Sequence, residues 1–374
     1  MQYTVNTERL LSLFLDLVKI NAISRAEKPV ADFLVPIMSQ LGASIDFDNA
    51  HLSLSGEIGN MFCEFPGTVE GETLLFSAHM DTVQPTENLN LVISDDRIMT
   101  DGTTILGADD RAGIAAIIEM IRTIKENSIP HPPIEIIFNI AEEIGLMGSQ
   151  FLDYSKVSAK IGFIPDTSSS PGAIIYSAPA QKHLKATING KASHAGMAPQ
   201  DGISAITALA KAIARMPQGK IDNETTANVG IISGGKATNI IADKAVAECE
   251  ARSRNPEKLI KLINEMQTIF IEEAEQIGAI ANIEITDLYP SFKLPLDTNT
   301  IQIASQAAIE LGLPVTISET GGGSDANFFN GAGIKTVIIG TGMCNPHSTR
   351  EYILKEDLYN LSEWMLKMIN ISIC

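Results

Sequence analysis

Five groups of acidic or imidazole side chains stand where predicted apolar strands end. They are His79 with Asp81, Asp109-Asp110, Glu142-Glu143, Asp166 and His347. In an open α/β sheet, ligands bind beyond the carboxyl ends of the strands, so we expect these groups to converge in space. Nitrogen and carboxylate ligands in this number suggest a two-zinc hydrolytic centre.

The first group pairs an imidazole with a carboxylate. His79 and Asp81 are two residues apart, so on an extended chain their side chains face the same way. A histidine that binds a metal through one ring nitrogen usually donates its other N–H to a carboxylate, and Asp81 suits that role. The alternative is a structural histidine at a strand end, since H-x-D alone is a weak signal.

The two acidic doublets hold like charges that repel unless something positive lies between them. Adjacent residues do not easily point at one atom, so one glutamate of Glu142-Glu143 could bind a metal while the other activates water. A helix N-terminus behind Asp109 would favour a carboxylate there. Alternatively, the doublets are solvated, Asp166 forms a turn and His347 is an ordinary loop residue. Finding all five groups at strand ends favours the metal centre.

The elements that must position these groups alternate along the chain. Apolar runs at 73–78, 134–140 and 160–165 are typical of buried strands, whereas 7–19 and 111–125 have a helical apolar period. Alternating strands and helices imply crossover connections and a mostly parallel sheet flanked by helices, an α/β fold.

A second pattern begins near residue 180. It reads as strand 182–190, helix 202–216, strands 228–233 and 244–252, helix 256–277 and strand 282–287. This order predicts a ferredoxin-like α+β domain, 180–290, inserted into a domain made of 1–179 and 291–374. The first domain then resumes with helix 298–311, strand 335–340 and a terminal helix from Lys355.

Composition excludes some partners. Forty-five acidic against 27 basic side chains give a formal net charge of −18, which would repel a phosphate backbone, so we expect no nucleic acid. Residues 1–20 lack the apolar region of a signal peptide, and we expect no membrane span. The four cysteines are Cys63, Cys249, Cys344 and Cys374, and none of them form C-x-x-C pairs. Scattered cysteines suit a reducing compartment, so we expect a cytoplasmic protein.

Four motifs carry a family resemblance. They are S-A-H-M-D-T at 77–82, G-A-D-D-R-A-G at 107–113, A-E-E-I-G at 141–145 and P-H-S at 346–348. Together they resemble the co-catalytic two-zinc exopeptidases and deacylases, the superfamily that includes peptidase T. The likeness spans nearly the whole chain. It is specific for the superfamily and less so for the substrate.

The resemblance implies roles for the residues of these motifs. Asp109 would bridge two zinc ions, and the peptide bond after it would be cis. His79 and Asp166 would complete one zinc site, and Glu143 and His347 the other. Glu142 would be the general base, while Asp81 would orient His79. Cobalt or manganese would also suit these ligands.

The inserted domain resembles the family's lid, which also forms a homodimer. His194, in G-K-A-S-H-A-G, would reach the active site of the partner subunit and stabilise the oxyanion. Asn239 and Arg252 match positions that contact substrate in relatives. A guanidinium suits a peptide carboxylate. Arg252 could instead pair with Glu250, and His194 could be a plain loop residue.

We therefore expect an aminopeptidase acting on short peptides. One departure concerns specificity: peptidase T has an arginine before its Gly-Gly-Thr-Asp segment, where this chain has Thr320 before Gly321-Gly322-Gly323-Ser324-Asp325. The missing cation leaves open an amino-acid N-deacylase. A metal-binding or peptide-binding protein without catalysis is the further alternative.

Overall fold

A computed structural model describes residues 4–373 of the chain, and Cys374 lies outside them. The chain folds into two compact units. Unit 1 contains residues up to 177 together with 294–319 and those from 324 onward, and unit 2 contains 178–293 with 320–323. No helix within residues 4–373 is long and apolar enough to cross a bilayer.

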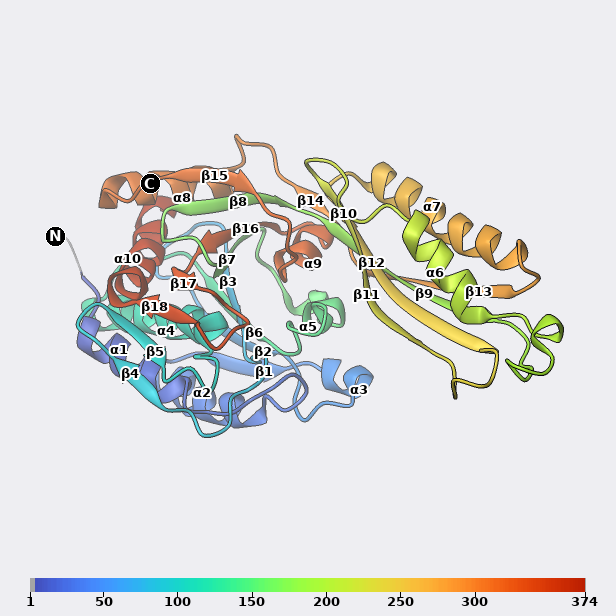
Figure 1. Cartoon of the computed structure of the whole chain (residues 1–374). Coiled ribbons are helices and arrows are strands. Elements are labelled where there is room, and N and C mark those ends of the chain that lie inside the picture. The colour runs from blue at the N-terminus through green and yellow to red at the C-terminus, as the bar shows by residue number, and fades with distance from the viewer. Residues whose placement is uncertain (1–3, 374) are drawn as a thin grey trace. The chain divides into compact units, whose positions relative to one another are not determined.

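A mostly parallel sheet forms the centre of unit 1, with strands in the order β1-β2-β6-β3-β7-β16-β8 and with β15 also paired with β8 (Figure 1). The strands are β1 Ser44–Phe47, β2 Met61–Phe65, β3 Leu74–His79, β6 Ile134–Asn139, β7 Ile161–Thr167, β8 Ala173–Ala178, β15 Thr316–Glu319 and β16 Lys335–Gly340. The short strand β14, Phe292–Lys293, belongs to unit 2. Strands β6, β3, β7 and β16 pair in parallel, whereas β1, β2 and β6 pair antiparallel at one edge. The mostly parallel sheet expected from the sequence is confirmed.

Strands β3 and β6 lie in the middle of this sheet, and every residue in them is buried. Strands covered on both faces read as continuous apolar runs, which is why the sequence showed them clearly. Strand β7 extends two residues beyond its predicted end, so Asp166 lies within the strand rather than after it. Pairing with β16 continues as far as Thr167, which keeps the chain extended there.

Helices α1, α4 and α10 pack against one another, as Figure 1 shows, and α10 also packs on α8. The helices of unit 1 are α1 Thr7–Leu17, α2 Lys28–Gln40, α3 Ala50–Leu54, α4 Ala108–Asn127, α5 Met147–Gln150, α8 Asn299–Leu311, α9 Ala326–Gly331 and α10 Lys355–Ser372. Helix α4 packs on strands β3 and β7, so it brings its N-terminus near their ends.

A small antiparallel sheet in unit 1 was not expected from the sequence. Its order is β17-β18-β5-β4, from β17 Met343–Cys344, β18 Tyr352–Leu354, β5 Arg97–Thr100 and β4 Leu91–Ile93. These strands have two to four residues each, too few for an alternating pattern to be distinctive. The sheet anchors both ends of the loop that carries His347.

Unit 2 has the strand and helix order expected of a ferredoxin-like domain. Its sheet runs β10-β11-β12-β9-β13, and α6 and α7 lie on one side of it (Figure 1). The elements are β9 Ala180–Asn189, α6 Ala205–Arg215, β10 Gly219–Lys220, β11 Thr225–Gly234, β12 Lys244–Ser253, α7 Pro256–Glu275 and β13 Ile280–Tyr289. Along most of β9 and β12, alternate side chains are buried under the helices. Most of these buried side chains are aliphatic, and many of them are alanine.

Candidate metal centre

Three of the predicted groups lie at or just beyond the carboxyl ends of neighbouring parallel strands. His79 is the last residue of β3, Glu142 comes three residues after β6, and Asp166 lies near the end of β7. Because β3 pairs in parallel with both β6 and β7, the carboxyl ends of these strands meet at one edge. The side chains that follow them therefore lie close together.

Asp109 comes from the start of helix α4. The helix begins after Gly107, whose φ is +74°, and its φ/ψ angles become helical only after Asp109 and Asp110. The Asp109–Asp110 peptide bond is cis, as the resemblance implied. His347 lies in the loop after β17 and has a positive φ of 59°. This loop and the α4 turn bring residues from opposite ends of the chain to the edge of the sheet.

Asp109 is the centre of the cluster. Its Oδ1 lies 3.0 Å from His79 Nε2, and its Oδ2 lies 3.2 Å from His347 Nε2. His347 Nε2 is also 3.0 Å from Glu143 Oε2. Two groups with potential ligand atoms within 4.8 Å of one another share this aspartate: His79 with Asp109 and Asp166, and Asp109 with Glu143 and His347. The structure thus brings all five predicted ligands together.

Asp81 joins His79 to the segment that carries both glutamates. His79 Nδ1 lies 3.0 Å from the Asp81 carbonyl oxygen and 3.3 Å from its Oδ1. The Asp81 carboxylate accepts hydrogen bonds from the backbone N–H groups of Glu142 and Glu143, each at 3.1 Å. A neutral His79 that donates through Nδ1 leaves Nε2 without a proton, free to act as a ligand.

The pKa values of the acids report an excess of buried negative charge. Burial, together with neighbouring carboxylates, raises the pKa of Glu142 well above its usual value. Burial and then Asp109 raise the pKa of Asp166 to about 8. Although burial opposes it, hydrogen bonds from His347 and His79 lower the pKa of Asp109. Hydrogen bonds to Asp109 and Glu143 raise the pKa of His347 to about 10.

The donor set fits a pair of divalent cations. Ligand atoms bound about 2.0–2.2 Å from a tetrahedral zinc ion lie about 3.4 Å apart, close to the observed separations of 3.0–3.2 Å. Buried Glu143 Oε1 has no hydrogen-bond partner among residues 4–373. Divalent charge would satisfy this oxygen and oppose the burial and the carboxylate repulsion that together raise the pKa values of Glu142 and Asp166.

The predicted substrate residues belong to unit 2. His194 is exposed, and its Nδ1 accepts hydrogen bonds from the backbone N–H groups of Gly196 and Met197, each at 3.1 Å. The segment around His194 pairs with the one around Asn239, since Ala195 donates its backbone N–H to the Asn239 carbonyl. The structure thus holds these two residues on adjoining segments.

Arg252 pairs with Glu250, which was the alternative to a substrate contact considered from the sequence. Its guanidinium donates two hydrogen bonds to Glu250, at 2.9 and 3.2 Å. The Glu250 carboxylate also accepts from Gln181 at 2.6 Å. Arg252 is therefore engaged within unit 2 in the state that the structure describes.

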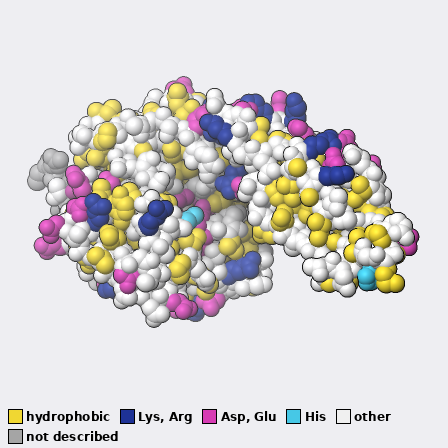
Figure 2. Space-filling view, in the orientation of Figure 1, with side chains coloured by type: hydrophobic (Ala, Val, Ile, Leu, Met, Phe, Trp, Pro, Cys, Tyr) yellow, Lys and Arg dark blue, Asp and Glu magenta, His cyan; other side chains and the backbone are white. Residues whose placement is uncertain are grey.

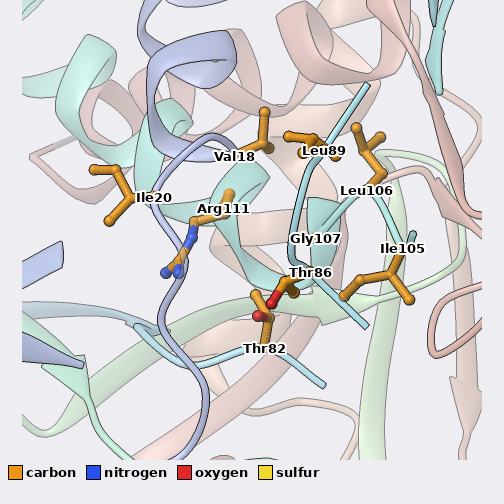
Figure 3. A pocket seen from close by; sticks show the side chains of 9 residues that line it. All are labelled: Val18, Ile20, Thr82, Thr86, Leu89, Ile105, Leu106, Gly107 and Arg111. Carbon is orange, nitrogen blue, oxygen red and sulfur yellow. The ribbon is translucent and has the colours of Figure 1, made fainter. Parts of the chain in front are cut away.

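Sequence reasoning missed Arg111, which is 1% exposed although it follows the acidic doublet directly. Its Nη1 donates to the carbonyl oxygen of Met80, between His79 and Asp81. Its Nε and Nη2 have no hydrogen-bond partner in the described chain. Arg111 also lines a cavity of about 10 Å³ together with Thr82 and Thr86 (Figure 3). The available signal was its position, as the first residue of the predicted helix 111–125 and directly after the acidic doublet.

Two buried carboxylates near the centre were also missed. Glu27 accepts from the backbone N–H groups of Arg25 at 2.7 Å and Ala141 at 2.9 Å, and Ala141 has a positive φ of 50°. Burial, together with Asp81, raises the pKa of Asp325 to about 6. Neither residue follows a predicted strand directly, so spacing along the chain did not single them out.

Comparison with known proteins agrees with this geometry. Residues 75–371 match the model of "Peptidase family M20/M25/M40". This match covers most of the chain and both groups of candidate ligands. The chain belongs to peptidase family M20. It is therefore a hydrolase of the metallopeptidase class.

Several similar proteins match almost the whole chain. The chain is 41% identical to the uncharacterized protein YqjE of Bacillus subtilis, over 98% of each protein. Among solved structures it resembles aminopeptidase PepT from Bacillus cereus, with 39% identity, a TM-score of 0.92 and coverage of 99% and 100% of the two chains. A tripeptidase from Staphylococcus aureus is 37% identical, with a TM-score of 0.96 and the same coverage.

Proposed function

We propose that this M20 protein is an aminopeptidase that removes N-terminal residues from short peptides. The observation that carries the proposal is the pair of ligand groups that share Asp109. Similarity to an aminopeptidase and a tripeptidase over the whole chain supports the substrate class. Residues 1–179 and 291–374 would form the catalytic domain, and 180–290 the lid.

Two divalent ions would occupy the two groups, His79 and Asp166 holding one, Glu143 and His347 the other, and Asp109 both. Zinc suits this mixture of imidazole and carboxylate ligands, and cobalt or manganese would also fit. When bound, such ions act as Lewis acids that polarise the scissile carbonyl and make water more acidic.

Glu142 would act as the general base. Its backbone is held by Asp81, while its side chain belongs to the cluster that includes His79 and Glu143. It would accept a proton from the attacking water at a carboxylate oxygen and deliver that proton to the leaving amine nitrogen. Burial, followed by the charge of Asp166, raises the pKa of Glu142, which suits a carboxyl group that must hold a proton between two steps.

His194 would donate a hydrogen bond to the carbonyl oxygen as negative charge develops there. Because its Nδ1 accepts two backbone N–H groups, the proton of the neutral ring lies on Nε2, which is left to donate. By resemblance, the lid of one subunit would bring His194 to the active site of its partner in a homodimer. Asn239 and Arg252 would contact the peptide, and Arg252 would first have to exchange its contact with Glu250.

The test of the catalytic proposal is Glu142→Ala. We expect turnover of a tripeptide to fall by more than about 100-fold while two zinc ions per chain are retained, because the removed group moves a proton and is not assigned as a ligand. Tripeptide hydrolysis and metal analysis would be measured together. Glu70→Ala, at an exposed glutamate, is the control. Near-normal turnover in Glu142→Ala would show that another residue is the base.

A substrate panel separates the peptidase from an N-deacylase of the same superfamily. The residue before the Gly321-Gly322-Gly323 run is Thr320, not arginine, so the chain lacks one cation that could bind a peptide carboxylate. We expect tripeptides to be cleaved faster than acetylated amino acids, and the reverse order would favour the deacylase. No hydrolysis of either class with added zinc, cobalt or manganese would favour a binding protein.

We further propose that the enzyme works in the cytoplasm.

A further inference from the structure

Helix α4 begins without a cap of its own. Its N-cap residue is Gly107, which has no side chain to accept a hydrogen bond. The first backbone N–H groups of a helix have no partners within the helix. Here the backbone departs from helical angles at Asp109 and Asp110, so the buried N–H groups around this turn need acceptors from elsewhere in the chain.

Glu351 supplies those acceptors from 242 to 245 residues away. Its Oε2 accepts the backbone N–H groups of Leu106 at 2.9 Å and Gly107 at 2.7 Å. Its Oε1 accepts the N–H of Asp109 at 3.1 Å. Glu351 is 1% exposed, so water does not compete for these bonds. A carboxylate at the start of a helix is also favoured by the helix dipole.

Glu351 also ends the loop that carries His347. Its own N–H donates to the Ser348 carbonyl oxygen at 3.0 Å, and the Ser348 hydroxyl donates to the Asn345 carbonyl oxygen at 2.8 Å. Strand β18 starts at the next residue and pairs with β5. The loop is therefore compact, and its Glu351 end is held by a sheet.

One carboxylate thus ties the turn that carries Asp109 to the loop that carries His347. The side chains of Asp109 and His347 belong to one ligand group, in which His347 Nε2 lies 3.2 Å from Asp109 Oδ2. The other Asp109 oxygen, Oδ1, faces His79. If the turn moved relative to the loop, the distance from Asp109 to His347 would change while the distance from Asp109 to His79 need not.

We propose that Glu351 is a positioning residue that sets the geometry of the group formed by Asp109, Glu143 and His347. It acts through the backbone of Asp109 and contacts neither the cation nor the substrate. The inference rests on the proposed metal centre. It predicts that Glu351 governs the affinity for one of the two cations, beyond any contribution to the stability of the fold.

The experiment compares Glu351→Gln and Glu351→Asp with the parent protein and with Glu356→Gln. Glu356 is exposed on α10 and loses the same charge, so it is the matched control. Chelator-treated protein would be titrated with zinc in a calorimeter well below its unfolding temperature. We expect the parent and Glu356→Gln to bind two ions. Glu351→Gln should lose roughly 10- to 100-fold in affinity for one of them, and Glu351→Asp should lie between.

A second measurement does not depend on whether the variants fold. In the parent protein, zinc should slow hydrogen exchange at the amides of Leu106, Gly107 and Asp109, since the cations and Glu351 hold the same turn. Unchanged exchange at these amides would overturn the proposal. So would parent-like affinity for both ions in folded Glu351→Gln. If the parent itself bound no zinc, the proposed function would fail first, which distinguishes the two failures.

Discussion

At the scale of single residues, buried carboxylates hold the backbone of the site. Asp81 fixes the Glu142-Glu143 segment, Glu27 fixes Ala141, and Glu351 fixes the turn before Asp109. Each carboxylate accepts at least two backbone N–H groups. A carboxyl group has two oxygens with several lone pairs, so one side chain can accept from more than one backbone N–H. The ligands are thereby held in place by side chains that need not touch a cation.

Glu27 gives a prediction for pH. Burial, and then the charge of Asp81, raises the pKa of Glu27 to about 7 from 4.5. A carboxyl group whose pKa is higher in the folded state binds its proton more tightly there. It therefore destabilises the fold increasingly as pH rises from about 4.5 to 7. Glu27→Gln removes this effect and can keep the Oε1 contacts with Arg25 and Ala141.

As pH rises from 4.5 to 7.5, we expect the difference in free energy of unfolding, Glu27→Gln minus parent, to increase by about 3 kcal/mol. Urea unfolding of both proteins in chelator would measure the difference. Glu57→Gln, at an exposed glutamate outside the cluster, should track the parent. Parallel pH profiles for Glu27→Gln and the parent would contradict the raised pKa.

At the scale of elements, an ion pair joins helix α1 to helix α4. Arg9 donates from Nε and Nη2 to the two oxygens of Glu119, both at 2.8 Å, and Glu119 is fully buried. Arg9 also contacts Glu126. Because α4 supplies Asp109 at its start, this pair helps to seat a helix that the site needs. Surface pairs such as Lys19–Asp16, at 3.4 Å, lack such burial.

Arg9→Ala should lower the free energy of unfolding by about 2–3 kcal/mol, since it leaves a buried carboxylate without its cation. Lys19→Ala should change it by less than about 0.5 kcal/mol. Chemical denaturation of the two variants beside the parent measures both effects. If Arg9→Ala and Lys19→Ala lowered the free energy of unfolding equally, burial of Glu119 would not strengthen the Arg9–Glu119 ion pair. A double variant, Arg9→Met with Glu119→Gln, should recover part of the loss.

At the scale of the whole molecule, bound cations should add to stability. A ligand that binds only the folded state stabilises it by about 4 kcal/mol per site when present at 1,000 times its dissociation constant. We expect chelation to lower the melting temperature of unit 1 by roughly 10 °C and zinc to restore it. Scanning calorimetry would measure the shift. Glu143→Ala, which lacks one ligand, should respond less, and an unchanged transition in the parent would argue against the centre.

Unit 2 gives a prediction for assembly. Strand β10 covers only part of β11, and the uncovered part exposes Ile231 and Ile232, at 59% and 64%. Exposed apolar side chains along an uncovered strand favour association with another chain. Figure 2 shows basic and acidic side chains beside one another on the visible face, with hydrophobic side chains among them.

We expect the parent to sediment as a dimer and Ile232→Lys to sediment at about half that mass. Leu52→Lys changes an apolar side chain of the same size that is 72% exposed in unit 1, and it should leave the dimer intact. Analytical ultracentrifugation distinguishes these outcomes. A monomeric parent would show that His194 does not serve a partner subunit. A dimeric Ile232→Lys would place the interface elsewhere.

Local patterning determined much of this protein. Continuous apolar runs predicted β3, β6 and β7 because strands covered on both faces must be apolar throughout, and the residues after them supplied the candidate ligands. The ferredoxin-like order of unit 2 followed from the sequence of its segments, which read as strand, helix, two strands, helix and strand. The short strands around His347 carried too few residues to show any period.

Tertiary structure decided which of those residues meet and what holds them. No spacing along the chain shows that Glu351 reaches the start of α4 or that Arg111 is buried beside Met80. For Arg252 the sequence left two roles open, and the fold places its guanidinium on Glu250. Such contacts depend on which backbone N–H and carbonyl groups remain unpaired once the elements have packed. The sequence by itself specifies the ligand chemistry, whereas packing specifies the supports that fix its geometry.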